Sequence, residues 1–279
     1  MPGRTTARED QIVHARLRQG PASATGHAPA PAPPAGARAG HTTDAAAGEV
    51  PRCWPGARRE AGHRQGADRG DIEESRHTMP IGIIGAGAVG QALAGRFVAA
   101  GEQVVISNSR GPASLRDLAA RTGPALRPAT VGEAADQEIV VLAVPWRRLG
   151  EAVAAAEVTD WQERIVVDTT NPLGPPDFRA ADLGGRVSSE IVAGLVPGAR
   201  LVKAFNTLPP DVLGADPLTP AGRRVIFLSG DHARANERVA RLARRVGWAA
   251  TDLGRLADGG RLQQFPGGPL AALKLVMEP

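Results

Sequence analysis

The residues that most clearly indicate a chemistry are three glycines, Gly85, Gly87 and Gly90, spaced as G-x-G-x-x-G. They follow a short apolar run and precede apolar residues at four-residue spacing, so they mark a strand–turn–helix junction. There Gly85 permits the tight turn, Gly87 lets the backbone approach a pyrophosphate, and Gly90 lets the helix pack on the strand. The first helical residues, Ala88 and Val89, offer N–H groups and partial positive charge to phosphates. The pattern predicts a dinucleotide-binding turn; a flexible turn without a ligand is the alternative.

The residues after the second expected strand indicate which dinucleotide binds. An NAD site usually has an acidic residue there to hold the ribose 2′-hydroxyl, but this chain has Asn108, Ser109 and Arg110. Ser and Asn can donate hydrogen bonds, Arg can hold a phosphate with paired donors, and no carboxylate repels a 2′-phosphate. We therefore expect NADP(H). The alternative is that Ser109 or Ser114 caps the next helix and Arg110 is a solvated charge.

Side chains that could transfer protons are scarce after residue 78. The remaining chain has no tyrosine or cysteine, one histidine, His232, and two lysines, Lys203 and Lys274. We expect Lys203 near the carboxyl end of a strand, as a proton donor, an anion anchor or a structural lysine, and Lys274 on the face of a last helix. The other histidines lie in residues 1–78 without metal-ligand spacing, so no metal site is predicted. Direct hydride transfer between two planar redox rings suits such a site, because positioning supplies most of the catalysis.

The composition divides the 279 residues into two parts. Residues 1–78 are dominated by Ala, Pro, Gly and Arg and cannot bury enough apolar surface to fold, so we expect a disordered tail. Residues 79–279 have the size of one α/β domain. Met79 stands just before the first strand, so one hypothesis is that the start codon is placed too far upstream; a genuine extension is the rival.

The charge and cysteine content limit the partners and the compartment. The net charge is +4, too small a surplus to indicate nucleic acid. The single cysteine, Cys53, excludes a disulfide within the chain and fits a reducing compartment. No apolar run reaches the ~18 residues of a membrane span, and no signal peptide is evident at the N-terminus. We expect a soluble cytoplasmic protein that acts on a small-molecule redox substrate, without nucleic-acid or membrane partners.

Strand and helix patterns alternate from residue 81 onward, which predicts an α/β, Rossmann-type doubly wound, mainly parallel sheet. Expected strands cover 81–84, 103–106, 138–144, 165–168, 201–205 and 225–229, with a weak one near Leu126. Expected helices cover 114–121, 148–156, 189–195, 233–246 and an apolar last segment with Leu270, Leu273, Leu275 and Val276, which packs on its own sheet or on a second copy in a homodimer. Ligands bind at the carboxyl ends of such strands, so the loops 85–90, 107–111, 144–146, 169–172 and 205–210 should converge on one cleft.

Together these segments resemble a predicted dinucleotide-binding family, the one that includes the coenzyme F-420 (deazaflavin)-dependent NADP oxidoreductases, and in particular its short branch. The reductase domain of eukaryotic membrane metalloreductases is similar at a greater distance. The stretches that carry the resemblance are 83–87, 107–112, 143–146, 168–172, 202–207, 252–254 and 267–270.

The resemblance implies roles for individual residues. Ser109 and Arg110 would hold the 2′-phosphate of NADP(H). Val144, Pro145 and Trp146 would lie along the cofactor near the nicotinamide, and Asn171, Pro172 and Asn206 would line the place where a second ring docks. Trp146 could instead be an ordinary rim aromatic, and Asn171-Pro172 a simple turn. The candidate catalytic residues are Lys203, Asn206 and Asn171.

Three hypotheses for the function remain open. The first is hydride transfer between NADP(H) and a deazaflavin (coenzyme F-420) or flavin-like ring. The second is NADPH-dependent reduction of a small imine or carbonyl with Lys203 as proton donor. The third is a non-catalytic module that senses NADP(H).

Overall fold

A computed structural model describes residues 80–174 and 179–278 of the chain. The expectations for the tail 1–78, for Met79 as a start and for Pro175 and Pro176 fall outside the described residues.

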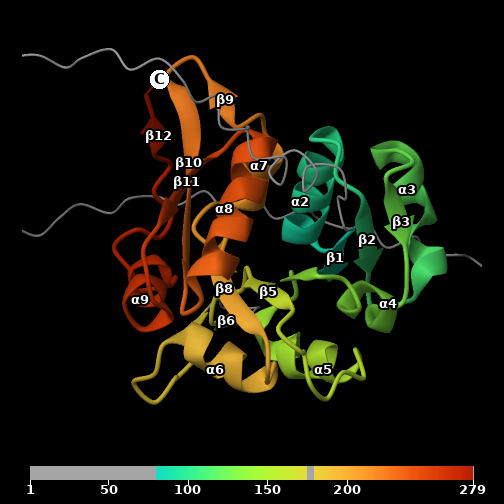
Figure 1. The fold of residues 1–279 in the computed structure, drawn as a ribbon, viewed down its shortest axis with the longest axis horizontal. Coiled ribbons are helices and arrows are strands. Elements are labelled where there is room, and N and C mark those ends of the chain that lie inside the picture. The colour runs from blue at the N-terminus through green and yellow to red at the C-terminus, as the bar shows by residue number, and fades with distance from the viewer. Residues whose placement is uncertain (1–79, 175–178, 279) are drawn as a thin grey trace, which may run out of the picture. The chain divides into compact units, whose positions relative to one another are not determined.

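A single twisted sheet organises the described chain (Figure 1). Its strands in spatial order are β11 (Ala249–Asp252), β10 (Gly222–Gly230), β8 (Arg200–Ala204), β5 (Ile165–Asp168), β4 (Ile139–Leu142), β1 (Ile81–Ile84), β2 (Val104–Ser107) and β3 (Leu126–Pro128). From β1 the chain builds outward to β2 and β3, then returns to β4 and continues through β5 and β8 on the other side. This reversal confirms the doubly wound arrangement and places the ligand-binding edge at the carboxyl ends of β1 and β4.

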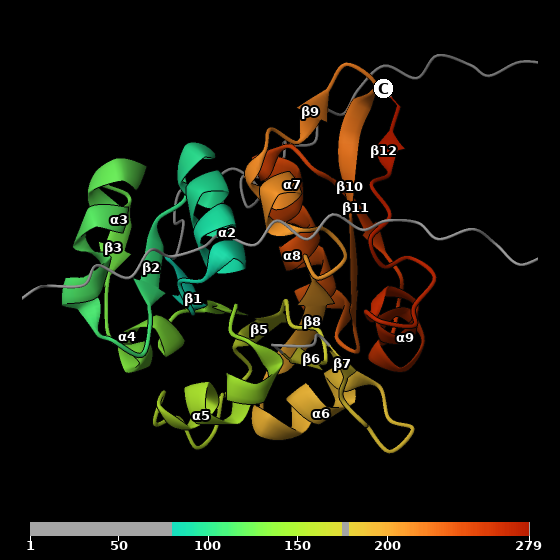
Figure 2. The same cartoon turned by 180° about the vertical axis from the view of Figure 1, so that it is seen from behind.

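The six strands from β3 to β8 are parallel, and β10 runs against β8. In the register, Leu228 pairs with Ala204, the last residue of β8, so the first part of β10 extends beyond that strand's carboxyl end. There it pairs with β9 (Leu218–Thr219) and β12 (Val276–Met277). This antiparallel extension is seen from both sides in Figures 1 and 2, and it places the C-terminal segment beside the ligand-binding edge.

Helices cover both faces of the sheet because alternate strand residues point to opposite sides. Val141 belongs to one apolar cluster and the adjacent Val140 to the other. The first cluster includes residues of α2 (Ala88–Ala99), α3 (Arg116–Thr122), α7 (Pro210–Gly214) and α8 (Ala233–Val246). The second includes residues of α4 (Val131–Ala135), α5 (Leu149–Ala154) and α6 (Ser188–Leu195). The remaining elements are the short hairpin β6 (Leu173–Gly174) with β7 (Arg179–Ala180), the turn of α9 (Arg261–Gln263), and helical turns at Pro112–Leu115, Trp146–Arg148 and Leu256–Gly260.

The prediction of a last apolar helix is wrong. Residues 264–275 form turns, followed by β12, and Ala272 has a backbone φ of 63°, which no α-helix contains. The segment is fixed instead by backbone hydrogen bonds from Ala272 N to the Thr207 carbonyl (2.9 Å) and from Val225 N to the Leu275 carbonyl (3.0 Å). A short apolar run fits helix and strand patterns equally, so periodicity could not decide between them. The sequence pattern also did not predict α4, α7 or β11.

A capping box fixes the start of α4, which borders the ligand-binding edge. Thr130 N donates to the Glu133 carboxylate (2.8 Å), and Glu133 N donates to Thr130 Oγ1 (3.2 Å). The hydrogen bond from the Thr130 backbone, together with the Arg127 guanidinium, lowers the pKa of Glu133 to about 2.

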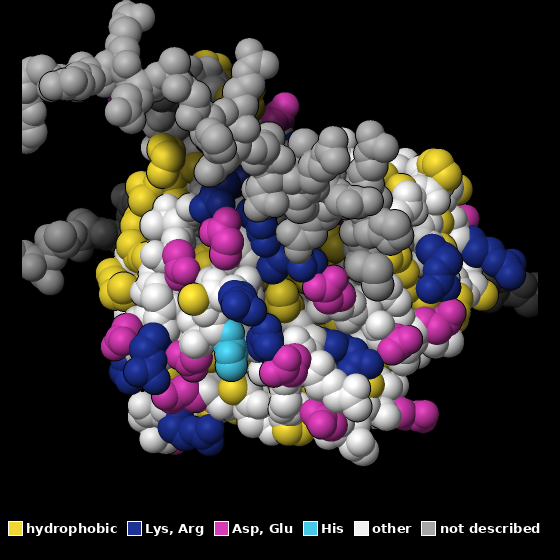
Figure 3. Space-filling model, in the orientation of Figure 1, with side chains coloured by type: hydrophobic (Ala, Val, Ile, Leu, Met, Phe, Trp, Pro, Cys, Tyr) yellow, Lys and Arg dark blue, Asp and Glu magenta, His cyan; other side chains and the backbone are white. Residues whose placement is uncertain are grey.

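Positive and negative side chains are interspersed on the face shown in Figure 3. His232 is exposed. Within residues 80–174 and 179–278, no helix is both long and apolar enough to cross a membrane.

A buried ion pair joins β5 to β8 at their carboxyl ends. Asp168 and Lys203 are register partners in the parallel pairing, and both side chains are 0% exposed. Lys203 Nζ donates to Asp168 Oδ2 at 2.8 Å and to the Thr170 carbonyl at 2.9 Å. Asp168 Oδ1 accepts from the amide and the hydroxyl of Thr170. Because every charged atom has a partner, the pair is tolerated inside the core, and it fixes the loop that follows β5.

Removing one member of this pair should destabilise the protein severely. We expect Lys203→Met to lower the free energy of unfolding by about 3–5 kcal/mol, because it leaves the Asp168 carboxylate buried without a counter-charge. Chemical denaturation measures the loss. The double variant Lys203→Met/Asp168→Asn, which removes the uncompensated charge, should be more stable than the single variant. A single variant as stable as the wild type would contradict the account.

Candidate functional site

Two adjoining cavities open at the carboxyl ends of the parallel strands. One has a volume of about 480 Å³ and the other about 660 Å³. They share the lining residues Gly87, Ala143, Val144 and Pro145, from the glycine turn and the end of β4. Residues from all five loops predicted to converge line one cavity or the other, so the loops do meet at this edge, but around two adjoining cavities and not one cleft. The two cavities flank the point where the strand order reverses.

The glycine turn between β1 and α2 has the shape that the sequence predicts. Gly85 has a φ of 111°, and a Cβ there would collide with the Ala143 carbonyl. A Cβ at Gly90 would collide with the Gly85 carbonyl, which is the close contact of helix and strand. At Gly87, in contrast, a Cβ would meet no heavy atom of the described chain within 4 Å. Protein packing therefore explains two of the glycines but not the third, whose open side faces both cavities.

Gly87 is also the N-cap residue of α2, a twelve-residue helix. The amides of the first helical turn have no partner inside the helix, and neither a capping side chain nor an acidic residue in the first turn satisfies them. Ala88 and Val89 from this turn line the larger cavity. The turn thus presents unpaired N–H groups and the positive end of the helix dipole beside the open space at Gly87, which fits a pyrophosphate.

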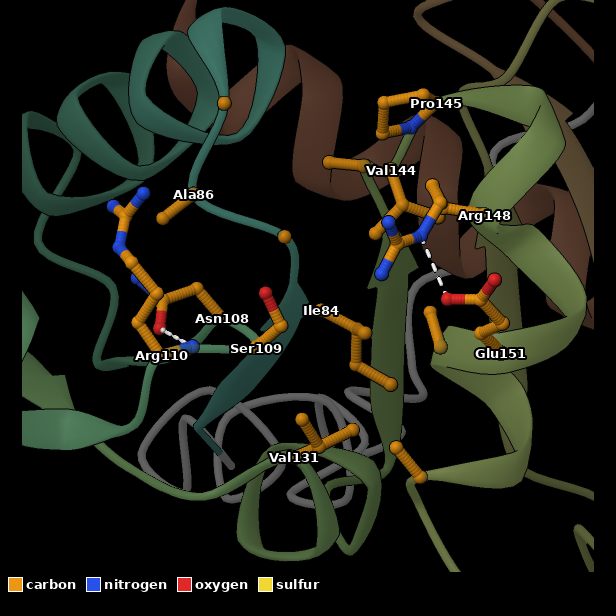
Figure 4. A pocket seen from close by; sticks show the side chains of 15 residues that line it. Ile84, Ala86, Asn108, Ser109, Arg110, Val131, Val144, Pro145, Arg148 and Glu151 are labelled. Carbon is orange, nitrogen blue, oxygen red and sulfur yellow. Dashed lines mark hydrogen bonds and ion pairs between the residues drawn. The ribbon is translucent and has the colours of Figure 1, made fainter.

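The loop after β2 forms one wall of the smaller cavity. Asn108 Oδ1 accepts a hydrogen bond from Arg110 N (2.9 Å), and Asn108 Nδ2 donates to Ser114 Oγ (3.0 Å). These bonds use the amide of Asn108 to shape the loop, and they leave Ser109 and Arg110 exposed at the cavity. Figure 4 shows both side chains on the same side of the pocket, with Arg110 beside Ala86 of the glycine turn. A hydroxyl and a guanidinium at this point can bind a phosphate.

The opposite wall of the smaller cavity comes from the end of β4 and from α5. Its polar part is Arg148, which forms an ion pair with Glu151 at 2.7 Å and faces Arg110 across the pocket in Figure 4. The apolar part is made by Ile84, Val131, Val144, Ala152 and Ala155. A slot with apolar walls and cationic rims suits a flat, polar heterocycle such as adenine. Arg148 and Glu151 were not among the site residues that the sequence predicted, although Arg148 follows the predicted Trp146 by two residues.

The larger cavity is mostly apolar. Most of its polar side chains come from the loops after β5 and β8, namely Thr169, Thr170, Asn171, Asn206 and Thr207. The apolar lining includes Val89, Trp146, Leu173, Phe205, Leu208 and Phe265, together with prolines 145, 209 and 210. Trp146 is half-buried at the rim, where it also packs against the apolar cluster under α5. A planar ring can bind in such a space without leaving polar groups unpaired.

Asn171 and Asn206 bind each other at the base of this cavity. Asn171 Nδ2 donates to the Asn206 carbonyl (2.8 Å), and Asn206 Nδ2 donates to Asn171 Oδ1 (3.0 Å) and to the Gln263 carbonyl (2.6 Å). Side-chain amides do not titrate, so neither residue can act as an acid or base. The pair instead ties together the two loops and the C-terminal segment. Gly85, Gly87, Ala88, Val89, Asn108, Ser109, Arg110, Val144, Pro145, Trp146, Asn171 and Asn206 are the predicted site residues that line a cavity.

The packing of Phe205 stabilises the backbone turn that precedes Asn206. The φ of 61° at Phe205 is unusual for a residue other than glycine, at a cost of roughly 1–3 kcal/mol. Its ring packs against Phe97 of α2 (6.2 Å between centroids) and Trp248 (5.4 Å), and it is 1% exposed. This aromatic packing stabilises the strained turn that places Asn206 at the cavity.

Lys203 does not line either cavity. It is fully buried and ion-paired with Asp168, so the expected role as proton donor does not fit its position, and the structural alternative does. Gly90 also lies behind the lining and serves helix packing. Conversely, Lys274, expected on a helix surface, lines the larger cavity. Its rarity, as one of two lysines in residues 79–279, was the signal that could have drawn attention to it. No group of three or more metal-ligating side chains exists in the described ranges.

Comparisons with known proteins agree with this geometry. The family model described as NADP oxidoreductase, coenzyme F420-dependent, matches residues 80–172, which contain the glycine turn and both walls of the smaller cavity. The chain is 29% identical over 196 residues to metalloreductase STEAP3 of Rattus norvegicus, covering 70% of this chain but only 38% of that protein.

Two further relatives are matched over most of their length. A hypothetical protein from Sinorhizobium meliloti, solved as a crystal structure, is 48% identical with a TM-score of 0.69, covering 75% of this chain and all of that one. The F420-dependent NADP reductase of Methanothermobacter thermautotrophicus is 30% identical over 199 residues, covering 64% of this chain and 83% of that protein. The chain belongs to the family of coenzyme F420-dependent NADP oxidoreductases.

Proposed function

We propose that this protein transfers a hydride between NADP(H), bound across the smaller cavity, and a planar deazaflavin (coenzyme F-420) or flavin-like acceptor in the larger one. The observation that carries the proposal is the shared wall, where Gly87, Ala143, Val144 and Pro145 border both cavities. Ligands bound in the two cavities would therefore both contact this wall. Bound NADPH supplies two electrons and a proton equivalent as hydride, and the acceptor takes any further proton from water.

Each part of NADP(H) has residues that fit it. The open side of Gly87 and the free amides of α2 would bind the pyrophosphate, and Ser109 with Arg110 would bind the 2′-phosphate. The apolar slot beside Val131 would hold the adenine, so that the nicotinamide reaches the shared wall at Val144.

The lining of the larger cavity favours a ring acceptor over an imine or carbonyl. Reduction of a carbonyl needs a proton donor at the nascent oxygen, and Lys203, the donor that the sequence offered, is buried beneath the cavity. Among the described lining residues, Lys274 is the sole side chain that could give up a proton. Ring-to-ring hydride transfer requires mainly orientation, which rigid apolar walls provide.

NADPH oxidation by the purified protein tests the reaction. With NADPH deuterated at the transferred position, we expect turnover with coenzyme F-420 or a flavin, and deuterium on the deazaflavin ring without exchange with solvent. Turnover restricted to imines or carbonyls would replace this proposal with the alternative reductase. Tight NADPH binding without turnover on any acceptor would favour the sensing module.

The glycines offer a matched pair of variants that separate packing from ligand binding. Gly87→Ala has room for its methyl group within the protein and an allowed backbone conformation (φ −75°), so we expect unchanged thermal stability but an affinity for NADPH lower by about tenfold or more. Gly90→Ala should lower the free energy of unfolding by about 1–3 kcal/mol, because its methyl group collides with the Gly85 carbonyl. Calorimetric titration and denaturation give the two quantities. Full affinity in Gly87→Ala would argue against a pyrophosphate at this turn.

The phosphate assignment predicts a change in cofactor preference. Arg110→Ala should weaken NADPH binding about 10–100-fold, as expected for loss of a hydrogen bond to a charged group, while NADH binding changes much less. Arg116→Ala, which removes an exposed guanidinium of α3 outside both cavities, is the control and should keep the wild-type preference. Equal loss of NADPH and NADH affinity in Arg110→Ala would show that Arg110 does not bind the 2′-phosphate.

A further inference from the structure

The larger cavity has a marked asymmetry of charge. Of the twenty described residues that line it, Lys274 alone carries a formal charge, and none of the twenty has a carboxylate. The other residues are apolar or carry neutral amides and hydroxyls. Lys274 is exposed, and it has no ion pair with any described residue. An ammonium without a counter-ion beside low-dielectric walls attracts an anion more strongly than one on an open surface.

The backbone that carries Lys274 is fixed on both sides. Two residues before it, Ala272 N donates to the Thr207 carbonyl, in the loop after β8 that lines the cavity. One residue after it, the Leu275 carbonyl accepts from Val225 N of β10. Between these anchors the chain passes directly from the base of the cavity to the extended part of β10. The backbone at Lys274 is therefore fixed at the cavity by main-chain hydrogen bonds to the loop after β8 and to β10, and the exposed side chain extends from this fixed point.

We propose that Lys274 binds an anionic oxygen group, a phosphate or a carboxylate, on the substituent of the hydride acceptor. The cavity then selects a planar redox ring that carries an anionic tail over the same ring without one. The apolar walls bind the ring at the shared wall with the smaller cavity, and Lys274, on the C-terminal side, binds the tail. This inference rests on the proposed function, because it assigns the second ligand of that reaction.

The apolar walls and Lys274 would recognise different parts of the acceptor. The neutral side chains near the shared wall supply no charge that favours an anionic acceptor over an uncharged one. Lys274 does distinguish them, because a charge-assisted hydrogen bond forms with one and not with the other. Lys274 thus acts on recognition of the acceptor and not on the transferred hydride, so its loss should raise KM for the anionic acceptor more than it lowers kcat.

Riboflavin and FMN form a suitable pair of probes because they have the same ring and differ by one phosphate. We would measure the Kd of each by flavin fluorescence with NADP⁺ present, so that no turnover occurs. The proposal predicts that the wild type binds FMN about tenfold more tightly than riboflavin, and that Lys274→Met abolishes this ratio. Lys274→Arg should retain it. Arg261→Met, which removes an exposed charge of α9 outside the cavity, should keep the wild-type ratio.

Two results would overturn the inference: an unchanged FMN-to-riboflavin ratio in Lys274→Met, or saturable binding of neither flavin. Oxidation of NADPH with riboflavin, measured in parallel on the wild type, reports on the proposed function separately. Turnover with equal affinity for both flavins would leave that function standing and remove the role of Lys274. A lysine-dependent preference for FMN without NADPH oxidation by riboflavin, FMN or coenzyme F-420 would support the anion site and contradict hydride transfer.

Discussion

The buried ion pair of Lys203 and Asp168 is the interaction on which the ligand-binding edge depends. Through its side chain, Lys203 fixes Asp168 and the Thr170 carbonyl in the loop after β5. Through its carbonyl, it accepts a hydrogen bond from Gln263 Nε2 (3.2 Å), in the C-terminal segment. Its register partner across the antiparallel pairing is Ser229 of β10, whose hydroxyl also binds Gln263. Lys203 thus links three separate parts of the chain, and its buried ammonium is compensated by Asp168 and the Thr170 carbonyl.

The smaller cavity is suited to anions and the larger one to an apolar ring, and different groups of the protein account for this difference. In the smaller one, anion binding comes mostly from the main chain, because the turn between β1 and α2 exposes helix amides and Gly87 leaves room for the ligand. Side chains add the phosphate contacts of Ser109 and Arg110. In the larger one, the polar groups of Asn171 and Asn206 are largely occupied by each other and by neighbouring backbone. The surface left to the ligand is therefore mostly apolar, and Lys274 is the one formally charged residue among the described lining residues.

The local residue pattern was enough to predict those segments whose pattern matches their surroundings in the fold. The glycine spacing predicted the turn at Gly85 because the steric demands of that turn are local. The near-continuous apolar runs of β4 and β5 predicted strands buried on both faces. In segment 264–277 the apolar pattern does not match the surroundings, because the apolar residues remain partly exposed. The conformation of this segment comes from backbone hydrogen bonds to Thr207 and Val225. These partners are distant in sequence, and no periodicity records them.

The sequence by itself determined the doubly wound α/β class, the dinucleotide turn and the candidates for a 2′-phosphate site, since each depends on residues within one strand–loop–helix unit. Only the tertiary structure decided which lysine is buried and which lines a cavity. The sequence favoured Lys203 as the functional lysine and expected Lys274 on a helix surface. In the fold, Lys203 of β8 is fully buried, while the C-terminal segment places Lys274 at the larger cavity. Burial and access are properties of how elements stack, and the stacking is set by contacts between residues far apart in the chain.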